Sequence, residues 1–176
     1  DQHTVLEPGL TIQDVLRSAF SWLFDLETRM NEICDKLGEA DEEQMTAWMD
    51  ELAEIQELLD AHDFYLIDSK VEEVARALGL MSLGLEHDVS DLSGGQRTKV
   101  LLTKLLLQSP DILILDEPTN HLDVDTIAWL ENYVKSARQT ILFITHDRYF
   151  LDRVCNQIIE LADGTLYSYD GNYSYY

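Results

Sequence analysis

The sequence predicts an α/β domain with parallel strands, a C-terminal β-hairpin and an inserted antiparallel helical hairpin. Two short aliphatic runs, residues 112–115 and 140–145, alternate with helical patterns, as parallel strands joined by helices do. Near the C-terminus, Asp163-Gly164 separates two further strand patterns, a dipeptide that favours a hairpin turn. Upstream, two long amphipathic stretches are joined by a short turn, so we expect two helices packed against each other.

The helical hairpin is expected over residues 14–62. A helical pattern begins at Thr11 and ends at Gly38, and a second follows Asp41, which with Gln44 resembles a capping box. Each pattern carries one apolar stripe at steps of three and four residues, and both stripes are expected to form the core of the hairpin. The stripes are Leu16, Phe20, Leu23, Leu26, Met30, Ile33 and Leu37, and then Met45, Trp48, Met49, Leu52, Ile55 and Leu59.

The α/β part follows two more helices. Ser69 and Glu72 predict a capped helix from Lys70 to Gly79. A glycine turn opens another helix that ends near Gln108. The aliphatic runs are expected to be strands buried on both faces, as in parallel sheets. The expected elements after them are strand 112–115, helix 125–136, strand 140–145, helix 148–154, and hairpin strands 157–161 and 165–169.

The net charge is −22, and it is uneven along the chain. Residues 1–90 carry 22 acidic and 5 basic side chains, against 12 and 7 in residues 91–176. Such an acidic surface does not bind nucleic-acid phosphates directly. It is either a solvated helical face or a protrusion that meets a basic protein surface. No apolar run reaches membrane-spanning length, and Cys34 and Cys155 are expected to be reduced, partly buried thiols.

A glycine turn at the start of a helix is the first candidate binding site. Ser93-Gly94-Gly95-Gln96 places unpaired backbone N–H groups at a helix N-terminus, where the helix dipole favours an anion. The two glycines let a phosphate approach the backbone closely, and Ser93 adds a hydroxyl donor. The alternative is a glycine-rich turn before a core helix, but the carboxylates that follow the next strand favour a phosphate site.

Polar side chains follow both aliphatic runs. Asp116 and Glu117 come where the first run ends, which is the usual place for ligand chemistry in a parallel sheet. Asp116 is suited to hold Mg²⁺, and Glu117 to accept a proton from an attacking water. His146 follows the second run, where it could donate a hydrogen bond to a terminal phosphate. A lone histidine is more often structural, but the parallel placement with Glu117 favours a catalytic role.

Taken together, these residues resemble the signature motif, Walker B motif, D-loop and switch histidine of an ATP-binding-cassette (ABC) ATPase, a P-loop NTPase. The stretches Glu117-Pro-Thr-Asn-His-Leu-Asp123 and Tyr169-Asp-Gly-Asn-Tyr-Ser-Tyr-Tyr176 resemble the ABC-F subfamily, soluble twin-cassette ATPases of which several act on the ribosome. The resemblance implies cytoplasmic ATP hydrolysis with Mg²⁺, and it identifies the helical hairpin with the arm insertion of that subfamily.

The resemblance also assigns individual roles. Gln2 falls where the Q-loop glutamine stands, near Mg²⁺ and the attacking water. Ser93, Gly94 and Gly95 would bind the γ-phosphate of ATP held by a second cassette, and Asp123 would be the D-loop aspartate at the interface between cassettes. No G-x-x-x-x-G-K-[S/T] loop occurs in the sequence, so we expect a fragment, the C-terminal part of a first cassette, with an incomplete sheet and a tendency to self-associate.

Four segments and several functions remain as hypotheses. The segments are 1–13 (Q-loop remnant and lead-in), 14–62 (arm-like hairpin), 63–90 (helical subdomain) and 91–176 (signature, Walker B, D-loop and switch-histidine part). The leading function is ribosome-associated ATP hydrolysis by the parent protein. The alternatives are the ATP-binding subunit of a membrane transporter and a non-catalytic interaction module. A chromosome-structure ATPase is disfavoured because the insertion is far too short for its coiled coil.

Overall fold

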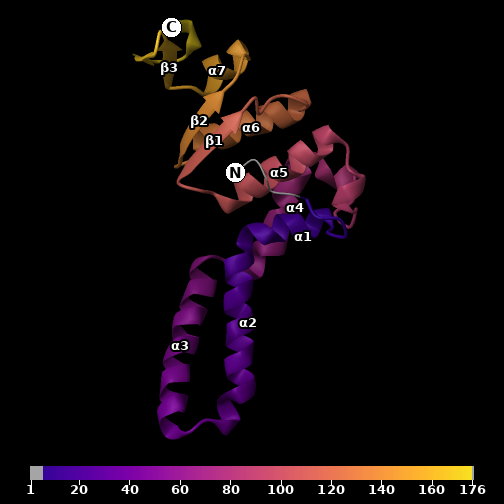
Figure 1. Cartoon of the computed structure of the whole chain (residues 1–176), viewed down its shortest axis with the longest axis vertical. Helices are drawn as coiled ribbons and strands as arrows, with labels where there is room; N and C mark the ends of the chain where they lie inside the picture. Colours follow the sequence, from indigo (N-terminus) through magenta and orange to yellow (C-terminus); the bar gives the residue numbers. More distant parts are fainter. Residues whose placement is uncertain (1–5, 176) are drawn as a thin grey trace.

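The computed structural model describes residues 6–175, and it has a long helical arm attached to an α/β body (Figure 1). The predicted architecture is confirmed, with parallel strands, a C-terminal β-hairpin and an antiparallel helical hairpin. The helices are α1 (Ile12–Arg17), α2 (Ser21–Lys36), α3 (Glu42–Ala61), α4 (Ile67–Ala77), α5 (Gly94–Gln108), α6 (Val124–Ser136) and α7 (Arg148–Val154). The strands are β1 (Ile112–Asp116), β2 (Thr140–Ile144), β3 (Gln157–Ala162) and β4 (Thr165–Asp170).

The arm consists of α2 and α3. The pattern that begins at Thr11 is broken by a 3-10 turn, Ser18–Phe20, so α1 belongs to the body and α2 to the arm. Asp41 caps α3, because its side chain accepts a hydrogen bond from the N–H of Gln44, which is one half of the predicted capping box. One ion pair crosses the arm, with Nε of Arg29 2.7 Å from the carboxylate of Glu51.

The seam of the arm is narrower than the apolar stripes predicted. Leu23, Ile33, Ile55 and Leu59 are buried. Leu26, Met30, Trp48 and Leu52 are partly buried against them. The expectation that Met45 and Met49 are core residues is wrong, because they are 44% and 52% exposed. Two helices alone bury only the side chains that face each other, and these methionines lie on the flank of that seam.

The helical body packs α1, α4 and α5 around one apolar core. Its buried residues include Ile12, Leu16, Val71 and Val100. The predicted start of α4 at Lys70 is wrong, because the helix begins at Ile67 without a side-chain cap. The chain enters it through a 3-10 turn after Asp63, whose φ is 51°, and buries Phe64 and Ile67 at that turn. Burial of these two side chains therefore decides where α4 starts.

Strands β1 and β2 form a parallel pair with Asp116 opposite Ile144. One face of the pair is covered: Leu113 and Leu115 are buried together with Leu106 of α5, Leu130 of α6 and Phe150 of α7. The prediction of strands buried on both faces is wrong for the residues described. Ile112, Ile114, Leu142 and Ile144 are 44% to 65% exposed, because no described element packs on that face.

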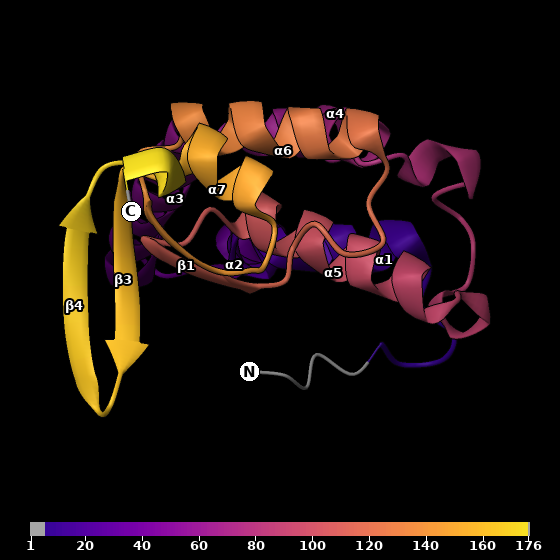
Figure 2. The ribbon, with the colours of Figure 1, turned by 90° about the horizontal axis from the view of Figure 1, so that it is seen from above.

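Strands β3 and β4 form a separate antiparallel sheet, joined at Asp163-Gly164 as predicted. Both turn residues have positive φ, 49° and 75°, as a two-residue type I′ turn requires. Figure 2 shows this hairpin at one side of the body, apart from β1. Over residues 6–175 no ladder joins β3 to β2, so the strands form two separate two-stranded sheets.

The two cysteines are free thiols in different environments. Cys34 is exposed on the arm, so the expectation of a partly buried thiol is wrong at this position. Cys155 follows α7 and is half-buried, and burial raises the pKa of its thiol. Neither residue contributes to the site described below.

Candidate functional site

The ends of β1 and β2 bring the predicted catalytic residues together. Asp116 is the last residue of β1, and the backbone N–H of Glu117 donates a 2.7 Å hydrogen bond to the carbonyl of Ile144. Glu117 has φ of 46°, a left-handed conformation that is uncommon for a residue with a side chain. The chain therefore turns sharply after Asp116, and the turn places the Glu117 carboxylate beside the end of β2.

The Glu117 carboxylate is held by two donors from the end of β2. The hydroxyl of Thr145 donates to Oε2 at 3.0 Å, and the backbone N–H of His146 donates to Oε1 at 3.1 Å. The side chain of Glu117 is 29% exposed, so one edge of the carboxylate faces solvent. Each carboxylate oxygen carries two lone pairs, and one on each remains for a further donor.

His146 lies beside this carboxylate with its ring free. Nε2 is 3.8 Å from Oε1 of Glu117, which is too long for a hydrogen bond, and the side chain is fully exposed. The next residue, Asp147, caps α7 by accepting from the N–H of Phe150 at 3.0 Å. The helix cap fixes the backbone at His146, and the imidazole can still turn toward a ligand.

Thr145 is a residue of the candidate site that the sequence did not predict. Its hydroxyl donates to Glu117 and accepts a hydrogen bond from the N–H of Asp147 at 3.2 Å. It therefore links the end of β1 to the cap of α7. The available signal was a hydroxyl side chain between an aliphatic run and a histidine, one position beyond the Asp116–Ile144 pair.

The predicted phosphate-binding turn opens α5 with a complete capping box. The Ser93 hydroxyl accepts from the N–H of Gln96 at 3.3 Å, and Oε1 of Gln96 accepts from the N–H of Ser93 at 2.8 Å. Helix geometry leaves the N–H groups of Gly94 and Gly95 without an intrahelical partner. The Ser93 hydroxyl proton also remains available. The side chain of Gln96, predicted to bind the cofactor, closes the capping box in this structure.

The two glycines have different surroundings. A Cβ built at Gly94 meets nothing within 4 Å, whereas one at Gly95 lies 3.5 Å from Cβ of His121. Neither glycine has positive φ, so the backbone conformation does not require glycine. The predicted phosphate-binding turn is therefore open at Gly94 and is contacted by the side chain of His121 at Gly95.

A second link joins this turn to the loop after β1. Nζ of Lys99 on α5 lies 3.3 Å from Oδ2 of Asp123, and Asp123 also caps α6 by accepting from the N–H of Thr126 at 2.8 Å. The hydrogen bonds from Thr126, reinforced by Lys99, lower the pKa of Asp123 to about 2. Lys99 was not predicted, because its partner lies 24 residues away in the sequence.

The site residues thus form two clusters joined by residues 117–123. Asp116, Glu117, Thr145 and His146 lie at the carboxyl ends of the strands. The second cluster is the start of α5 with His121 and Asp123. The connecting loop is compact, with the N–H of Asn120 donating to the carbonyl of Glu117 at 3.1 Å. Gln2, the remaining predicted site residue, lies outside the described residues.

The strand-end cluster fits a magnesium ion bound together with phosphates. Within residues 6–175 no group of three His, Cys, Asp or Glu side chains is arranged to hold a metal. Mg²⁺ does not need such a group, because it is usually held by one or two carboxylates, several waters and phosphate oxygens. Asp116, exposed at the end of β1, supplies the required hard oxygen ligand.

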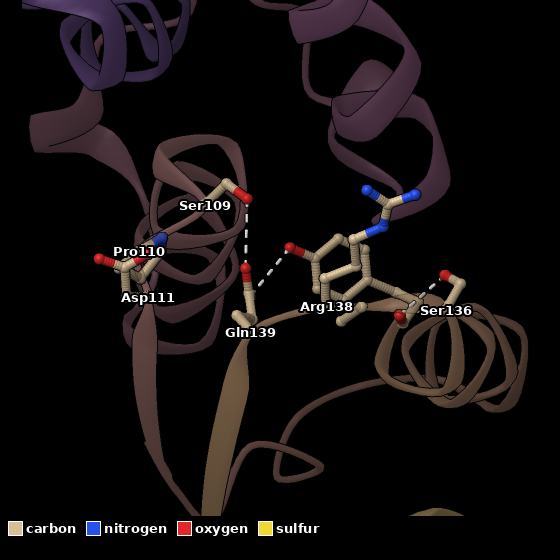
Figure 3. A pocket seen from close by; sticks show the side chains of 8 residues that line it. Ser109, Pro110, Asp111, Ser136, Arg138 and Gln139 are labelled. Carbon is tan, nitrogen blue, oxygen red and sulfur yellow. Dashed lines mark hydrogen bonds between the residues drawn. The ribbon is translucent and has the colours of Figure 1, made fainter.

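A hollow of 460 Å³ lies at the opposite ends of the same strands (Figure 3). The residues before β1 and β2 meet there, and the Ser109 hydroxyl donates to Oε1 of Gln139 at 3.2 Å. Nε2 of Gln139 donates to the Tyr133 hydroxyl at 3.2 Å, which donates to the carbonyl of Leu106. These polar groups are hydrogen-bonded to one another and connect the segments that precede the two strands. The hollow is therefore separate from the candidate site.

Both the sequence and the fold of this chain are similar to those of known proteins. A family model described as "ABC transporter" matches residues 1–120. The "Uncharacterized ABC transporter ATP-binding protein YfmM" of Bacillus subtilis (strain 168) is 54% identical over 173 residues, 98% of this chain and 33% of that protein. The "Energy-dependent translational throttle protein EttA" of Haemophilus influenzae is 39% identical over 175 residues, 98% of this chain and 31% of that protein.

The chain therefore spans about a third of the length of these curated relatives. A solved structure described as "Structure of ATP binding subunit of ABC transporter" superposes with a TM-score of 0.62 at 20% identity. The superposition covers 94% of this chain and 55% of that one, and it shows a shared fold. No helix among residues 6–175 is both long enough and apolar enough to cross a bilayer.

Proposed function

The chain belongs to the ATP-binding-cassette family, to its ABC-F type, and we propose that it supplies the catalytic carboxylate and the signature turn of an ATPase that acts on the ribosome. The observation that carries the proposal is the Glu117 carboxylate, oriented by Thr145 and His146 at the ends of two parallel strands. The complete protein in this proposal contains a second cassette and a phosphate-binding loop, which residues 1–176 do not include.

Glu117 acts on the attacking water. Two fixed donors orient its carboxylate, and the free lone pairs accept the proton of a water bound at the solvent edge. The exposed ring of His146 donates a hydrogen bond to the terminal phosphate from the other strand. The Glu117 carboxylate is held by its two donors before the nucleotide arrives, whereas the exposed imidazole of His146 turns to meet the phosphate.

Asp116 holds the metal. When Mg²⁺ is bound, it neutralises charge on the phosphate oxygens. Asp116 provides the carboxylate ligand at the end of β1, and Gln2, by resemblance, contributes near the same ion. Glu117, which is held by the end of β2, is left free to handle the proton.

The start of α5 binds the γ-phosphate of ATP held by the second cassette. The N–H groups of Gly94 and Gly95 have no intrahelical partner, the Ser93 hydroxyl can donate, and the α5 dipole favours the anion. Asp123 lies at the interface between cassettes. The links Gly95–His121 and Lys99–Asp123 support a role for the loop after β1 in positioning this turn.

The ribosome is favoured over a membrane as the place of action, and with it a cytoplasmic location. The support is the name of the EttA relatives, a translational throttle, together with the helical arm inserted in this chain. The alternative is a transporter subunit, which the name of the YfmM relative favours. A third possibility is that the isolated chain serves only as an interaction module, since it lacks a phosphate-binding loop in its own sequence.

Binding to ribosomes and to membranes distinguishes these alternatives. The complete protein with Glu117→Gln is mixed with purified ribosomes or with inverted membrane vesicles, each with and without ATP, and sedimented. We expect ATP-dependent sedimentation with ribosomes and none with vesicles. Sedimentation with vesicles alone would support the transporter subunit. A protein that binds ATP and sediments with neither would remove the ribosome from the function.

A further inference from the structure

The side chain of His121 lies against the phosphate-binding turn and has no role in the function proposed so far. A Cβ built at Gly95 would lie 3.5 Å from Cβ, 3.7 Å from Cγ and 4.0 Å from Nδ1 of His121, so the imidazole lies along this glycine. The residue is exposed, and its side chain makes no hydrogen bond or ion pair with any residue that the structure describes. Its ring nitrogens are therefore available to a ligand bound at the turn.

The loop after β1 fixes the backbone at His121. Its φ of 66° is left-handed, a conformation that histidine, asparagine and aspartate adopt more readily than other residues with a side chain. Before it, the N–H of Asn120 donates to the carbonyl of Glu117 at 3.1 Å. After it, the N–H of Leu122 donates to the carbonyl of Thr119 at 3.2 Å. The position of the imidazole is therefore set by a hydrogen-bonded loop on both sides.

The phosphate-binding turn alone offers few donors to a phosphate. Its donors are the N–H groups of Gly94 and Gly95, which have no intrahelical partner, and the hydroxyl of Ser93. The Gln96 side chain is already engaged, because its Oε1 accepts from the N–H of Ser93 at 2.8 Å. A terminal phosphate has three strong acceptor oxygens, and an imidazole carries at least one N–H in either protonation state. His121 can therefore add the donor that the turn lacks.

The charges beside the turn do not oppose an anion at this place. Asp123, two positions after His121, is paired with Nζ of Lys99 at 3.3 Å. The same carboxylate accepts a hydrogen bond from the N–H of Thr126 at 2.8 Å. Its negative charge is thus compensated by a cation and by a helix N-terminus, which leaves the positive end of the α5 dipole to act on a phosphate.

We propose that His121 is a further ligand of the γ-phosphate at the start of α5, to which its imidazole donates a hydrogen bond beside the N–H groups of Gly94 and Gly95. The inference rests on the proposed function, since it needs ATP held by a second cassette. It makes the loop after β1 a substrate contact as well as a support for the turn. ADP has no γ-phosphate, so this contact distinguishes ATP from ADP.

Variants that share the left-handed backbone but differ in the donor test the proposal. They are made in the complete protein carrying Glu117→Gln, and the Kd values for ATP and ADP are measured with Mg²⁺ present. His121→Gly suits the φ of 66° and removes the imidazole. His121→Asn also suits this φ and keeps an amide N–H near the place of Nδ1. Asp163→Gly is the matched control, since it removes a side chain at another left-handed position, φ 49°, in the β3–β4 turn.

His121→Gly is expected to weaken ATP binding about tenfold, the loss of one hydrogen bond to a charged group. His121→Asn should stay within about threefold of the parent because it retains a donor. ADP binding and the melting temperature should be the same in both, and Asp163→Gly should change none of these values. A ligand role is overturned by unchanged ATP binding in His121→Gly, by an equal loss in His121→Asn, or by a loss for ADP as large as that for ATP.

The same measurements separate this inference from the proposed function. A complete protein whose ATP hydrolysis requires Glu117, but whose ATP binding ignores both His121 variants, refutes the role of His121 and leaves the ATPase intact. A complete protein that binds no ATP refutes the proposed function, and the role of His121 with it.

Discussion

Thr145 donates a 3.0 Å hydrogen bond to the carboxylate of Glu117, and this bond joins the ends of two parallel strands at the candidate catalytic centre. The two residues are 28 positions apart in the sequence. They meet because Asp116 pairs with Ile144 and the chain turns at Glu117 with φ of 46°. The orientation of the proposed base is therefore set by the strand pairing, by this hydroxyl and by the backbone N–H of His146.

Removing that hydroxyl should slow hydrolysis without weakening nucleotide binding. In the complete protein, Thr145→Val is expected to lower kcat about tenfold, the cost of one lost hydrogen bond to a charged group. The Kd for ATP should stay within about twofold, because Thr145 touches the base and not the phosphates. Thr140→Val, at the exposed start of β2, is the control and should leave both values unchanged. Equal losses in binding and kcat would contradict an orienting role.

We predict that glycine is needed at position 94 for ATP hydrolysis and not for the stability of the fold. A methyl group at this position meets nothing within 4 Å, so Gly94→Ala should leave the melting temperature of the chain unchanged. In the complete protein the same methyl lies where the γ-phosphate approaches the backbone, so ATP hydrolysis should fall at least about tenfold. Gly38→Ala, on the arm and also without neighbours within 4 Å, should change neither. A destabilised Gly94→Ala chain would show that the glycine serves the fold.

The burial pattern of the arm predicts that an aspartate substitution is destabilising in the seam and tolerated on the flank. Ile55 is 4% exposed in the seam, whereas Met49 on the flank is 52% exposed. Ile55→Asp should cost about 3 kcal/mol or more and unfold the arm, because an unpaired charge would be buried. Met49→Asp, which makes the same change in net charge, should cost less than about 1 kcal/mol. Helicity by circular dichroism and the denaturation midpoint check both, and similar losses would refute the observed seam.

The lowered pKa of Asp123 predicts that the free energy of unfolding decreases in acid. Its folded pKa of about 2 lies below the ordinary 3.8, so its contribution is fully present above pH 3.8 and is lost as the pH falls through about 2. Asp123→Asn can still cap α6 but has no carboxylate to protonate. The difference in denaturation midpoint between wild type and Asp123→Asn should therefore shrink over this window. A difference independent of pH would show that the carboxylate charge contributes nothing.

Much of the fold could be predicted from the sequence because it depends on local patterns. The cap at Asp41, the Asp163-Gly164 turn and the strand positions all follow from signals within a few residues. The exposure of Met45 and Ile114 could not be predicted, because it depends on which elements pack nearby. The start of α4 was missed for the same reason, since burial of Phe64 and Ile67 prevailed over a capping pattern.

The residues of the candidate site also fall into those predicted from local sequence patterns and those that depend on contacts between distant segments. Asp116, Glu117 and His146 were found because each follows an aliphatic run, and the strand pairing then brought them together. Thr145 and Lys99 were missed, because each acts through a contact between distant segments. Their residue types are common, and only the geometry distinguishes them from other surface threonines and lysines.

The central claim, that Glu117 is the base of an ATPase, is tested most directly by single-turnover hydrolysis in the complete protein carrying Glu117→Gln. The amide keeps the size of the side chain and loses its basicity. We predict unchanged ATP binding and a loss of hydrolysis of at least about a hundredfold, while Glu160→Gln, on the exposed β3–β4 hairpin, retains full activity. Hydrolysis by Glu117→Gln at the wild-type rate would contradict the account.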